Sequence, residues 1–278
     1  MNRSRRSFID LGLKSVLLIG LGNSLQSFSP GSFRFPQKNK LHLRFAVASD
    51  GHYGQPQTDF ESYHDQMVGW INAEHQGRGV DFSFINGDLF HNDVAFLPLI
   101  KKKWDGLKMP YYVSHGNHDN TDAENWEKIW NMKLDYAFEV GDTGFIVLDT
   151  ADEKGKYICP KLDYAREQFE KFKSKKHLFV FMHITPVKWT KNAIDCPELV
   201  TMFSNQENLR AVFHGHDHDM DDVKQLNRKS YFFDSHIGGN WGTGYRGYRI
   251  VEITDAGEII TYQQNPDNQT KVNTNHIE

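Results

Sequence analysis

Short apolar runs alternate with longer amphipathic segments along most of the chain, and this pattern predicts its strands and helices. Residues 41–48 carry large apolar side chains at alternate positions and predict a strand. Apolar residues at helical spacing predict a helix over 60–74, and a short apolar run predicts a buried strand at 82–85. The same criteria predict helices at 94–104, 124–130 and 162–172, a hairpin of 136–140 with 145–148, and strands at 111–113, 178–182, 210–213, 231–233, 248–254 and 259–263.

The order of these elements predicts an α/β domain. Strands and helices alternate early in the chain and hairpins prevail late, which indicates a mixed sheet or two packed sheets flanked by helices. No second linker, internal repeat or low-complexity tract interrupts the part from residue 33 onward, and its length is within the range of one domain. We therefore predict a single domain over residues 33–265 and a polar C-terminal tail over residues 266–278.

The first 32 residues have the pattern of an export signal and a linker. An arginine pair, Arg5-Arg6, precedes an apolar stretch of about 11 residues, which is shorter than the about 20 residues of a membrane span. A basic start and a short apolar middle are typical of export signals, and the arginine pair resembles the twin-arginine type. We predict export to the periplasm and cleavage between about residue 23 and residue 35. The alternative is a chance arginine pair in an unstructured N-terminus.

Composition narrows the choice of partners. The formal net charge is −4, so the chain offers no general basic field for nucleic acid. After the signal, no apolar run is long enough to span a membrane, so we expect no transmembrane segment in the mature form. The two cysteines, Cys159 and Cys196, are too few for a disulfide scaffold, and the sequence leaves open whether they pair. It also leaves the oligomeric state open.

Residues that can bind metal follow five of the predicted strands. Asp50 and His52 follow the first strand, and because residues two apart on an extended backbone point to the same side, both can face one ion. His216 and His218 share a side by the same rule. The other residues of this kind at strand ends are Asp88, Asn117, His118, Asp119 and His183. Each one alone is more often structural than functional, but five such strand ends in one chain make a purely structural explanation much weaker.

The order Asp-x-His, Gly-Asp, Gly-Asn-His-Asp, His and Gly-His-x-His resembles that of the calcineurin-like metallophosphoesterase superfamily, over about residues 41–254. The resemblance implies a four-layer αββα sandwich, in which two packed mixed β-sheets are flanked by helices. It also implies a two-metal site with two ligand sets that share Asp88. The first set is Asp50, His52, Asp88 and His218, and the second is Asp88, Asn117, His183 and His216.

The implied reaction is hydrolysis of a phosphomonoester or phosphodiester by a metal-bound hydroxide, which would make the protein a metal-dependent phosphoric ester hydrolase with a small phosphate-ester substrate. Two cations about 3.5 to 4 Å apart neutralise the phosphoryl charge and lower the pKa of a bound water towards 7. His118 would donate a proton or hydrogen bond to the leaving group, and Asp119 would orient its ring. Ligands of this kind, without thiolate, suit Mn, Fe or Zn.

Two features are left open by the pattern. Three positions after Asp88, many relatives carry an acidic residue and purple acid phosphatases carry a tyrosine ligand, whereas this chain has His91. The missing tyrosine argues against a tyrosinate-bound iron, and His91 is either a hydrogen-bond partner of the site, a substrate contact or a loop residue. The glycine-rich loop 238–244 is either a plain turn or a phosphate contact. The aromatic residues in and just after this loop, Trp241 and Tyr245, either rim a cleft and stack on a base or sugar, or pack at the surface or in the core.

Two other functions remain as alternatives. A non-catalytic binding protein on the same fold tends to lose ligands or the catalytic histidine, whereas His118 and all seven ligand positions are present here. A nuclease of the same superfamily is disfavoured by the acidic charge, the absence of an added DNA-binding domain and the predicted export signal. Between monoester and diester hydrolysis the sequence does not decide.

Overall fold

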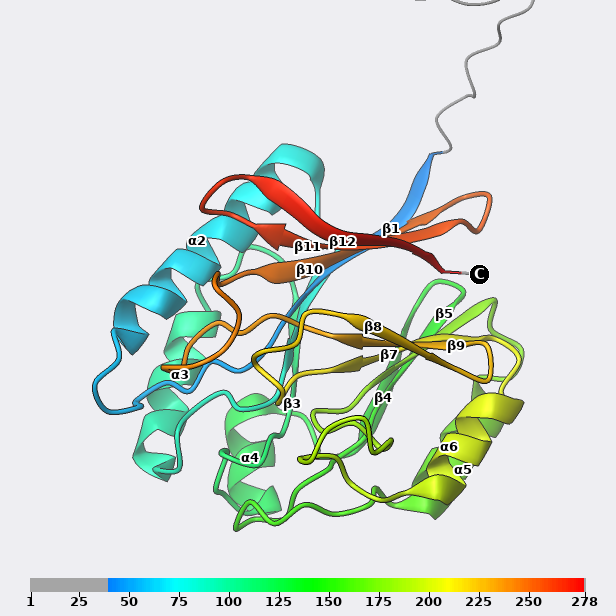
Figure 1. The fold of residues 1–278 in the computed structure, drawn as a ribbon, viewed down its shortest axis with the longest axis horizontal. Helices are drawn as coiled ribbons and strands as arrows, with labels where there is room; N and C mark the ends of the chain where they lie inside the picture. Colours follow the sequence, from blue (N-terminus) through cyan, green and yellow to red (C-terminus); the bar gives the residue numbers. More distant parts are fainter. Residues whose placement is uncertain (1–39, 278) are drawn as a thin grey trace, which may run out of the picture. The chain divides into compact units, whose positions relative to one another are not determined.

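Two six-stranded β-sheets lie face to face and carry helices on their outer surfaces in the computed structural model, which describes residues 40–277 (Figure 1). The first sheet has the strand order β12-β11-β10-β1-β2-β3, and the second has the order β4-β5-β6-β7-β9-β8. This arrangement confirms the predicted four-layer αββα class. The predicted export signal and its cleavage region lie outside the described residues.

The elements have the following bounds. The first sheet contains β1 (Leu41–Ala48), β2 (Phe82–Asn86), β3 (Tyr111–Ser114), β10 (Tyr248–Thr254), β11 (Ile259–Asn265) and β12 (Thr270–Ile277). The second contains β4 (Tyr136–Val140), β5 (Thr143–Val147), β6 (His177–Phe181), β7 (Leu209–His214), β8 (Val223–Leu226) and β9 (Lys229–Phe233). The helices are α2 (Phe60–Arg78), the short 3-10 helix η1 (Val94–Phe96), α3 (Leu97–Trp104), α4 (Ala123–Trp130), α5 (Leu162–Lys171) and α6 (Pro197–Asn205).

The alternation of side chains along β1 divides its apolar residues between two parts of the core. Phe45 points into the space between the sheets, which phenylalanines fill; there the rings of Phe84 and Phe181 stack with centroids 3.7 Å apart. Ala46 points the other way, to the layer beneath α2, α3 and α4. The helices α5 and α6 cover the second sheet in the same manner, for example with Phe169. Figure 1 shows α2 and α3 on one side of the sheets and α5 and α6 on the other.

Three elements were not predicted from the sequence. The hydrophobic pattern predicts no element in the segments that form the helix α6 and the strand β8. The predicted polar tail forms β12, an edge strand that pairs antiparallel with β11. Most β12 side chains are exposed, so the strand lacks the apolar pattern on which the prediction depended. The first sheet therefore continues to Ile277, beyond the predicted boundary at residue 265.

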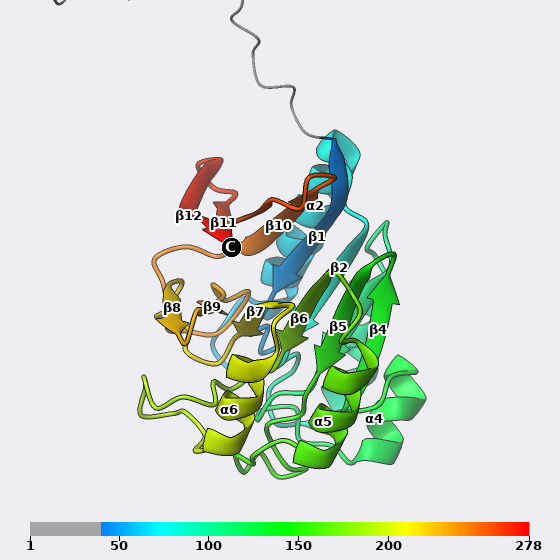
Figure 2. The same cartoon turned by 90° about the vertical axis from the view of Figure 1, so that its right-hand side faces the viewer.

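A disulfide joins Cys159 to Cys196, with their Cα atoms 5.5 Å apart. Cys159 lies in the loop before α5, and Cys196 directly precedes α6. The bond thus ties together the starts of two helices on the outer face of the second sheet, which lie side by side in Figure 2. Among the described residues, no helix is both long enough and apolar enough to cross a membrane.

The strands of both sheets deliver their loops to one place. β1, β2 and β3 are parallel to one another, and so are β5, β6, β7 and β9. The carboxyl ends of parallel strands meet at one edge of a sheet, where ligand sites commonly lie. Ser49, just after β1, forms an isolated parallel bridge with His236, just after β9. The two sheets therefore present their carboxyl ends to each other at the same edge.

Candidate metal centre

The backbone turns sharply at the ends of β1, β2 and β7, where predicted ligands lie. Asp50, His52, Asp88 and His216 have positive φ angles of 59°, 45°, 51° and 68°. Such angles are uncommon for residues other than glycine and are concentrated at functional sites. The directions of these side chains are therefore set by turns and not by extended backbone. The rule that residues two apart on an extended backbone point to the same side (the two-residue rule) does not explain the directions of Asp50 and His52.

Glycines of the sequence motifs allow the loops to approach the centre closely. A Cβ atom at Gly116 would overlap the backbone nitrogen and the carboxylate of Asp88. A Cβ atom at Gly215 would overlap the hydroxyl of Ser49. Because only glycine fits at these two positions, the loops after β3 and β7 can pack directly on the residues that follow β1 and β2.

The predicted metal-binding carboxylates and imidazoles form two neighbouring clusters. Within each cluster, one ligand atom from each residue lies within 4.8 Å of the others. The clusters are Asp50, His52 and His218, and Asp88, His183 and His216. The structure thus separates His216 from His218, which the two-residue rule had placed on one side. Their division between two clusters agrees instead with the ligand sets implied by the resemblance.

Asp88 lies between the two clusters. Its Oδ2 atom is 3.5 Å from His52 Nε2 in the first cluster and 3.2 Å from His183 Nε2 in the second. Its Oδ1 atom accepts a hydrogen bond from the backbone N–H of His118 at 2.8 Å. A carboxylate has enough lone pairs to bind a cation on either side. Asp88 is therefore placed to be shared by two ions.

Hydrogen bonds at Nδ1 leave the Nε2 atoms of two rings facing the centre. His183 Nδ1 donates to the carbonyl of Asn86 at 2.8 Å, and His218 Nδ1 donates to the carbonyl of Trp241 at 3.3 Å. A neutral ring that donates from Nδ1 has its lone pair at Nε2, which is the arrangement of metal-binding histidines. Among the described residues, the buried atoms Asn117 Oδ1 and His216 Nε2 have no hydrogen-bond partner.

The charges of the centre attract cations. Burial opposes ionisation of Asp50, but the His218 and His183 rings hold the pKa of its carboxyl well below the usual range. Burial also opposes protonation of His183, but Asp88 and Asp50 raise its pKa to about 10. Burial lowers the pKa of His216 to about 4, so this ring is neutral at pH 7. Two buried carboxylates beside imidazole nitrogens and an amide oxygen fit first-row metal ions such as Mn, Fe or Zn, and a bound cation would replace the proton on His183.

Comparison with known proteins agrees with this geometry. The sequence model of the calcineurin-like phosphoesterase family matches residues 43–220. The chain belongs to this family. No curated protein matches the sequence significantly.

Solved structures of other members of the fold resemble this calcineurin-like phosphoesterase. A dimetal phosphatase from Danio rerio aligns with a TM-score of 0.64 at 10% identity, over 86% of this chain and 99% of that one. A purple acid phosphatase from yellow lupin (Lupinus luteus) seeds aligns with a TM-score of 0.64 at 9% identity, over 86% and 54% of the two chains. The NAD nucleotidase of Haemophilus influenzae gives 0.52 at 12% identity, over 84% and 54%. This chain spans about half the length of the last two proteins, and the likeness shows the fold alone.

In this calcineurin-like phosphoesterase, Asn92 and not Asp119 contacts the ring of His118. His118 Nδ1 lies 2.9 Å from Asn92 Oδ1. The Asp119 carboxylate instead accepts the backbone N–H groups of Phe90 and Gly116, both at 2.9 Å, and burial raises its pKa to about 7. The prediction that Asp119 orients the His118 ring is therefore wrong. Asp119 joins the loop after β2 to the loop after β3 through these two hydrogen bonds.

His91 contacts both a predicted ligand and the predicted catalytic ring. Its Nδ1 atom lies 3.1 Å from His52 Nδ1. Its ring stacks on that of His118, with centroids 4.8 Å apart and an interplanar angle of 13°. Of the three possibilities that the sequence left open, the structure supports a hydrogen-bond partner of the site. The contact holds His52 with its Nε2 atom directed at the centre.

We expect His91→Ala to weaken metal binding about 10- to 100-fold, because losing the hydrogen bond behind a metal-binding histidine has an effect of this size. Competition with a coloured chelator measures the affinity in purified protein. His42→Ala is a suitable control, because His42 pairs with Asp142 and belongs to neither cluster. An unchanged affinity in His91→Ala would contradict a role in holding His52 and would leave a substrate contact or a loop residue as the explanation of His91.

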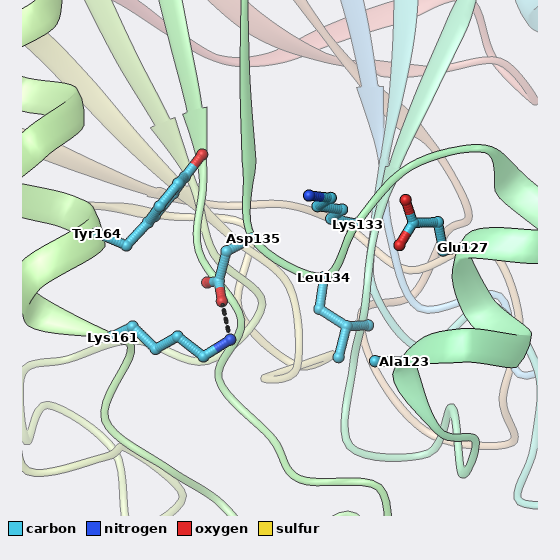
Figure 3. Close-up of a pocket in the computed structure, with 7 residues that line it drawn as sticks. All are labelled: Ala123, Glu127, Lys133, Leu134, Asp135, Lys161 and Tyr164. Atoms are coloured by element: carbon cyan, nitrogen blue, oxygen red, sulfur yellow. Dashed lines mark ion pairs between the residues drawn. The ribbon is translucent and has the colours of Figure 1, made fainter.

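A separate hollow lies between α4 and α5, with a volume of about 310 Å³ (Figure 3). Lys161 and Asp135 face each other in it and form an ion pair at 3.0 Å. The other lining residues are Ala123, Glu127, Lys133, Leu134 and Tyr164. None of them belongs to either cluster, so the hollow is distinct from the candidate metal centre.

Proposed function

We propose that this calcineurin-like phosphoesterase hydrolyses phosphomonoesters or phosphodiesters with two metal ions. The observation that carries the proposal is the position of Asp88 between two clusters of buried ligands, within 3.5 Å of a ring in each. One ion would be held by Asp50, His52, Asp88 and His218, and the other by Asp88, Asn117, His183 and His216. When bound, the ions would neutralise phosphoryl charge and lower the pKa of a coordinated water towards 7.

His118 would serve as the acid for the leaving group. Its ring is half-buried and adjoins His52, with the two centroids 4.8 Å apart. Because Nδ1 donates to Asn92, the Nε2 atom is the one available to the substrate. A proton held there can pass to the departing oxygen as the phosphorus–oxygen bond breaks. Asn92 would fix the direction in which that proton is presented.

The names of similar proteins support a two-metal phosphatase without deciding the substrate. The Danio rerio protein is described as a dimetal phosphatase, and the lupin protein as a purple acid phosphatase. The ligand set here contains no tyrosine, and we propose Mn, Fe or Zn as its ions. Metal analysis of protein purified without added metal tests this choice.

The proposed activity can be tested with three substrates. The purified protein, loaded with Mn or Zn, is assayed on p-nitrophenyl phosphate, bis(p-nitrophenyl) phosphate and a cyclic nucleotide. We expect hydrolysis of at least one, its loss with a chelator and its return when metal is added. A protein that binds no metal and hydrolyses none of the three would contradict the proposal and favour the non-catalytic alternative.

We also propose that the protein is exported to the periplasm by its twin-arginine-type N-terminus. The disulfide Cys159–Cys196 supports this proposal, because disulfides persist in oxidising compartments such as the periplasm. Mass spectrometry of the periplasmic protein should find an N-terminus between residues 23 and 35, and replacing Arg5 and Arg6 by lysine should retain the protein in the cytoplasm. Periplasmic protein that begins at Met1 would contradict cleavage.

A further inference from the structure

Two exposed aromatic side chains adjoin the metal centre. Trp241 is 44% exposed and Tyr157 is 39% exposed, and they are two of the five large hydrophobic side chains that are exposed among residues 40–277. The Trp241 ring stacks on that of His218, with centroids 4.4 Å apart and an angle of 9°. The Tyr157 ring meets that of His216 edge-on, with centroids 5.1 Å apart. Each cluster of ligands therefore has one aromatic side chain beside it.

The loop 238–244 holds the Trp241 ring in a fixed direction. The rings of His236, His218 and Trp241 form a continuous stack, in which the first two have centroids 5.2 Å apart. The Trp241 carbonyl also accepts the hydrogen bond from His218 Nδ1. Gly242 has a φ of 132°, and a Cβ atom there would lie 2.6 Å from the His236 ring. The glycines thus let the loop fold closely around the two histidines and leave the indole at the surface.

Packing accounts for only part of the indole surface. The His218 ring stacks on the indole and the His52 ring lies beside it with centroids 5.2 Å apart, while Trp241 remains 44% exposed. Tyr245, the aromatic residue just after this loop, is half-buried and donates a hydrogen bond to Asp221 at 2.6 Å. Tyr245 is therefore a structural residue, whereas the exposed part of Trp241 has no structural task. An aromatic surface held rigidly beside a site is suited to stack on a planar group.

We propose that Trp241 and Tyr157 bind the organic part of the phosphate ester, and that the preferred ester carries a planar aromatic group, such as a nucleobase or an aryl ring. The inference rests on the proposed function, because the phosphoryl group must lie on the two clusters for its substituent to reach these rings. Stacking of a base on an aromatic side chain contributes about 5- to 150-fold in affinity.

A matched pair of ligands tests the proposal. Adenosine 5′-monophosphate and ribose 5-phosphate carry the same phosphate on the same sugar and differ in the base. Each is measured as an inhibitor of the hydrolysis of whichever of the three test substrates the wild-type protein cleaves. We expect the adenosine compound to inhibit the wild-type protein at least 5-fold more strongly, as stacking predicts. Trp241→Ala should remove most of this preference, and Trp241→Phe should keep most of it.

Two further variants separate stacking from damage to the site. Tyr157→Ala should reduce the same preference while leaving the loop 238–244 intact. Leu99→Ala removes another large side chain, 48% exposed on α3, and should leave the preference unchanged. Metal content is measured in every variant, so that a loss of metal is not taken for a loss of stacking. If Trp241→Ala loses metal, the preference for the adenosine compound is measured in Trp241→Phe and Tyr157→Ala to test the inference.

The possible failures have different meanings. Equal inhibition of the wild-type protein by the two ligands would overturn the inference and leave the proposed hydrolysis intact. Variants that keep their full metal content and are inhibited less strongly by both ligands, to the same degree, would also overturn the inference and leave the proposed hydrolysis intact. A wild-type protein that hydrolyses none of the three test substrates would overturn the proposed function, and the inference with it.

Discussion

Asp88→Asn should lower phosphoesterase activity by more than 100-fold and leave the purified protein with much less metal. The substitution keeps the shape of the side chain but removes its negative charge from between His52 and His183, which lie 3.5 Å and 3.2 Å away. An amide offers a metal ion one neutral oxygen, and so it cannot replace a carboxylate that both ions share. The expected loss exceeds the 10- to 100-fold effect of residues that only orient a ligand.

Metal content and turnover are measured on the same preparations of Asp88→Asn. Asp135→Asn is a matched control, because Asp135 is also a buried carboxylate and accepts the backbone N–H of Asp149 at 2.9 Å, but it lies in the hollow beside α4. It should keep its metal and its activity. If Asp88→Asn kept both, the two clusters would not share this residue and the two-metal proposal would fail.

The sequence predicted the layers of the fold well where a strand is buried. In β1, successive residues such as Phe45 and Ala46 pack into different parts of the core, so apolar residues occupy both faces and the strand has a strong apolar signal. A strand at the edge of a sheet does not have to pack both of its faces into the core. The exposed β12 therefore reads as a polar tail, although pairing with β11 gives it a regular structure. The predicted helix 94–104 is divided into η1 and α3, and Pro98 lies in the first turn of α3, where its missing N–H is tolerated.

Part of the site could be predicted because the ligands lie in short motifs at strand ends. Asp50 and His52, for instance, are recognisable by their spacing alone. Their direction was not predictable from that spacing, because it depends on left-handed backbone at both residues. The residues that hydrogen-bond to the site residues were still harder to predict. Asn92 reaches His118 through a loop that packs back on the centre, and no spacing rule connects them.

The contacts of the two aromatic side chains beside the metal centre, Trp241 and Tyr157, were also not predictable from the sequence. Trp241 lies on a glycine-rich loop, which in the sequence resembles either a turn or a phosphate contact. The sequence offers stacking on a base or sugar as one alternative for Trp241, and the structure adds the contact of its indole with His218. Tyr157 carried no signal in the sequence, because nothing near it resembles a motif. Contacts between distant loops depend on the whole fold, and a single sequence records them weakly.

We expect His118→Ala to lower turnover by about 10²- to 10⁴-fold, the usual size of an acid–base contribution, and to keep the metal content of the wild-type protein. The ring adjoins His52 but belongs to neither of the two ligand clusters, so its removal should leave both intact. The loss should be greater with phenyl phosphate than with p-nitrophenyl phosphate, because a poorer leaving group needs the proton more. Steady-state kinetics with the two esters and metal analysis of the same samples measure both effects.

Variants of the neighbouring residues decide how the ring is held. Asn92→Ala removes the hydrogen bond to His118 Nδ1 and should reproduce part of the loss of turnover, with the same dependence on the leaving group. Asp119→Asn should act on stability instead, because the Asp119 carboxylate joins the backbone of Phe90 to that of Gly116. The opposite pattern, in which Asp119→Asn changes the leaving-group dependence and Asn92→Ala does not, would restore Asp119 as the partner of the ring. Loss of metal in His118→Ala would instead make His118 a ligand, since His52, His91 and His118 also lie close enough together to hold an ion.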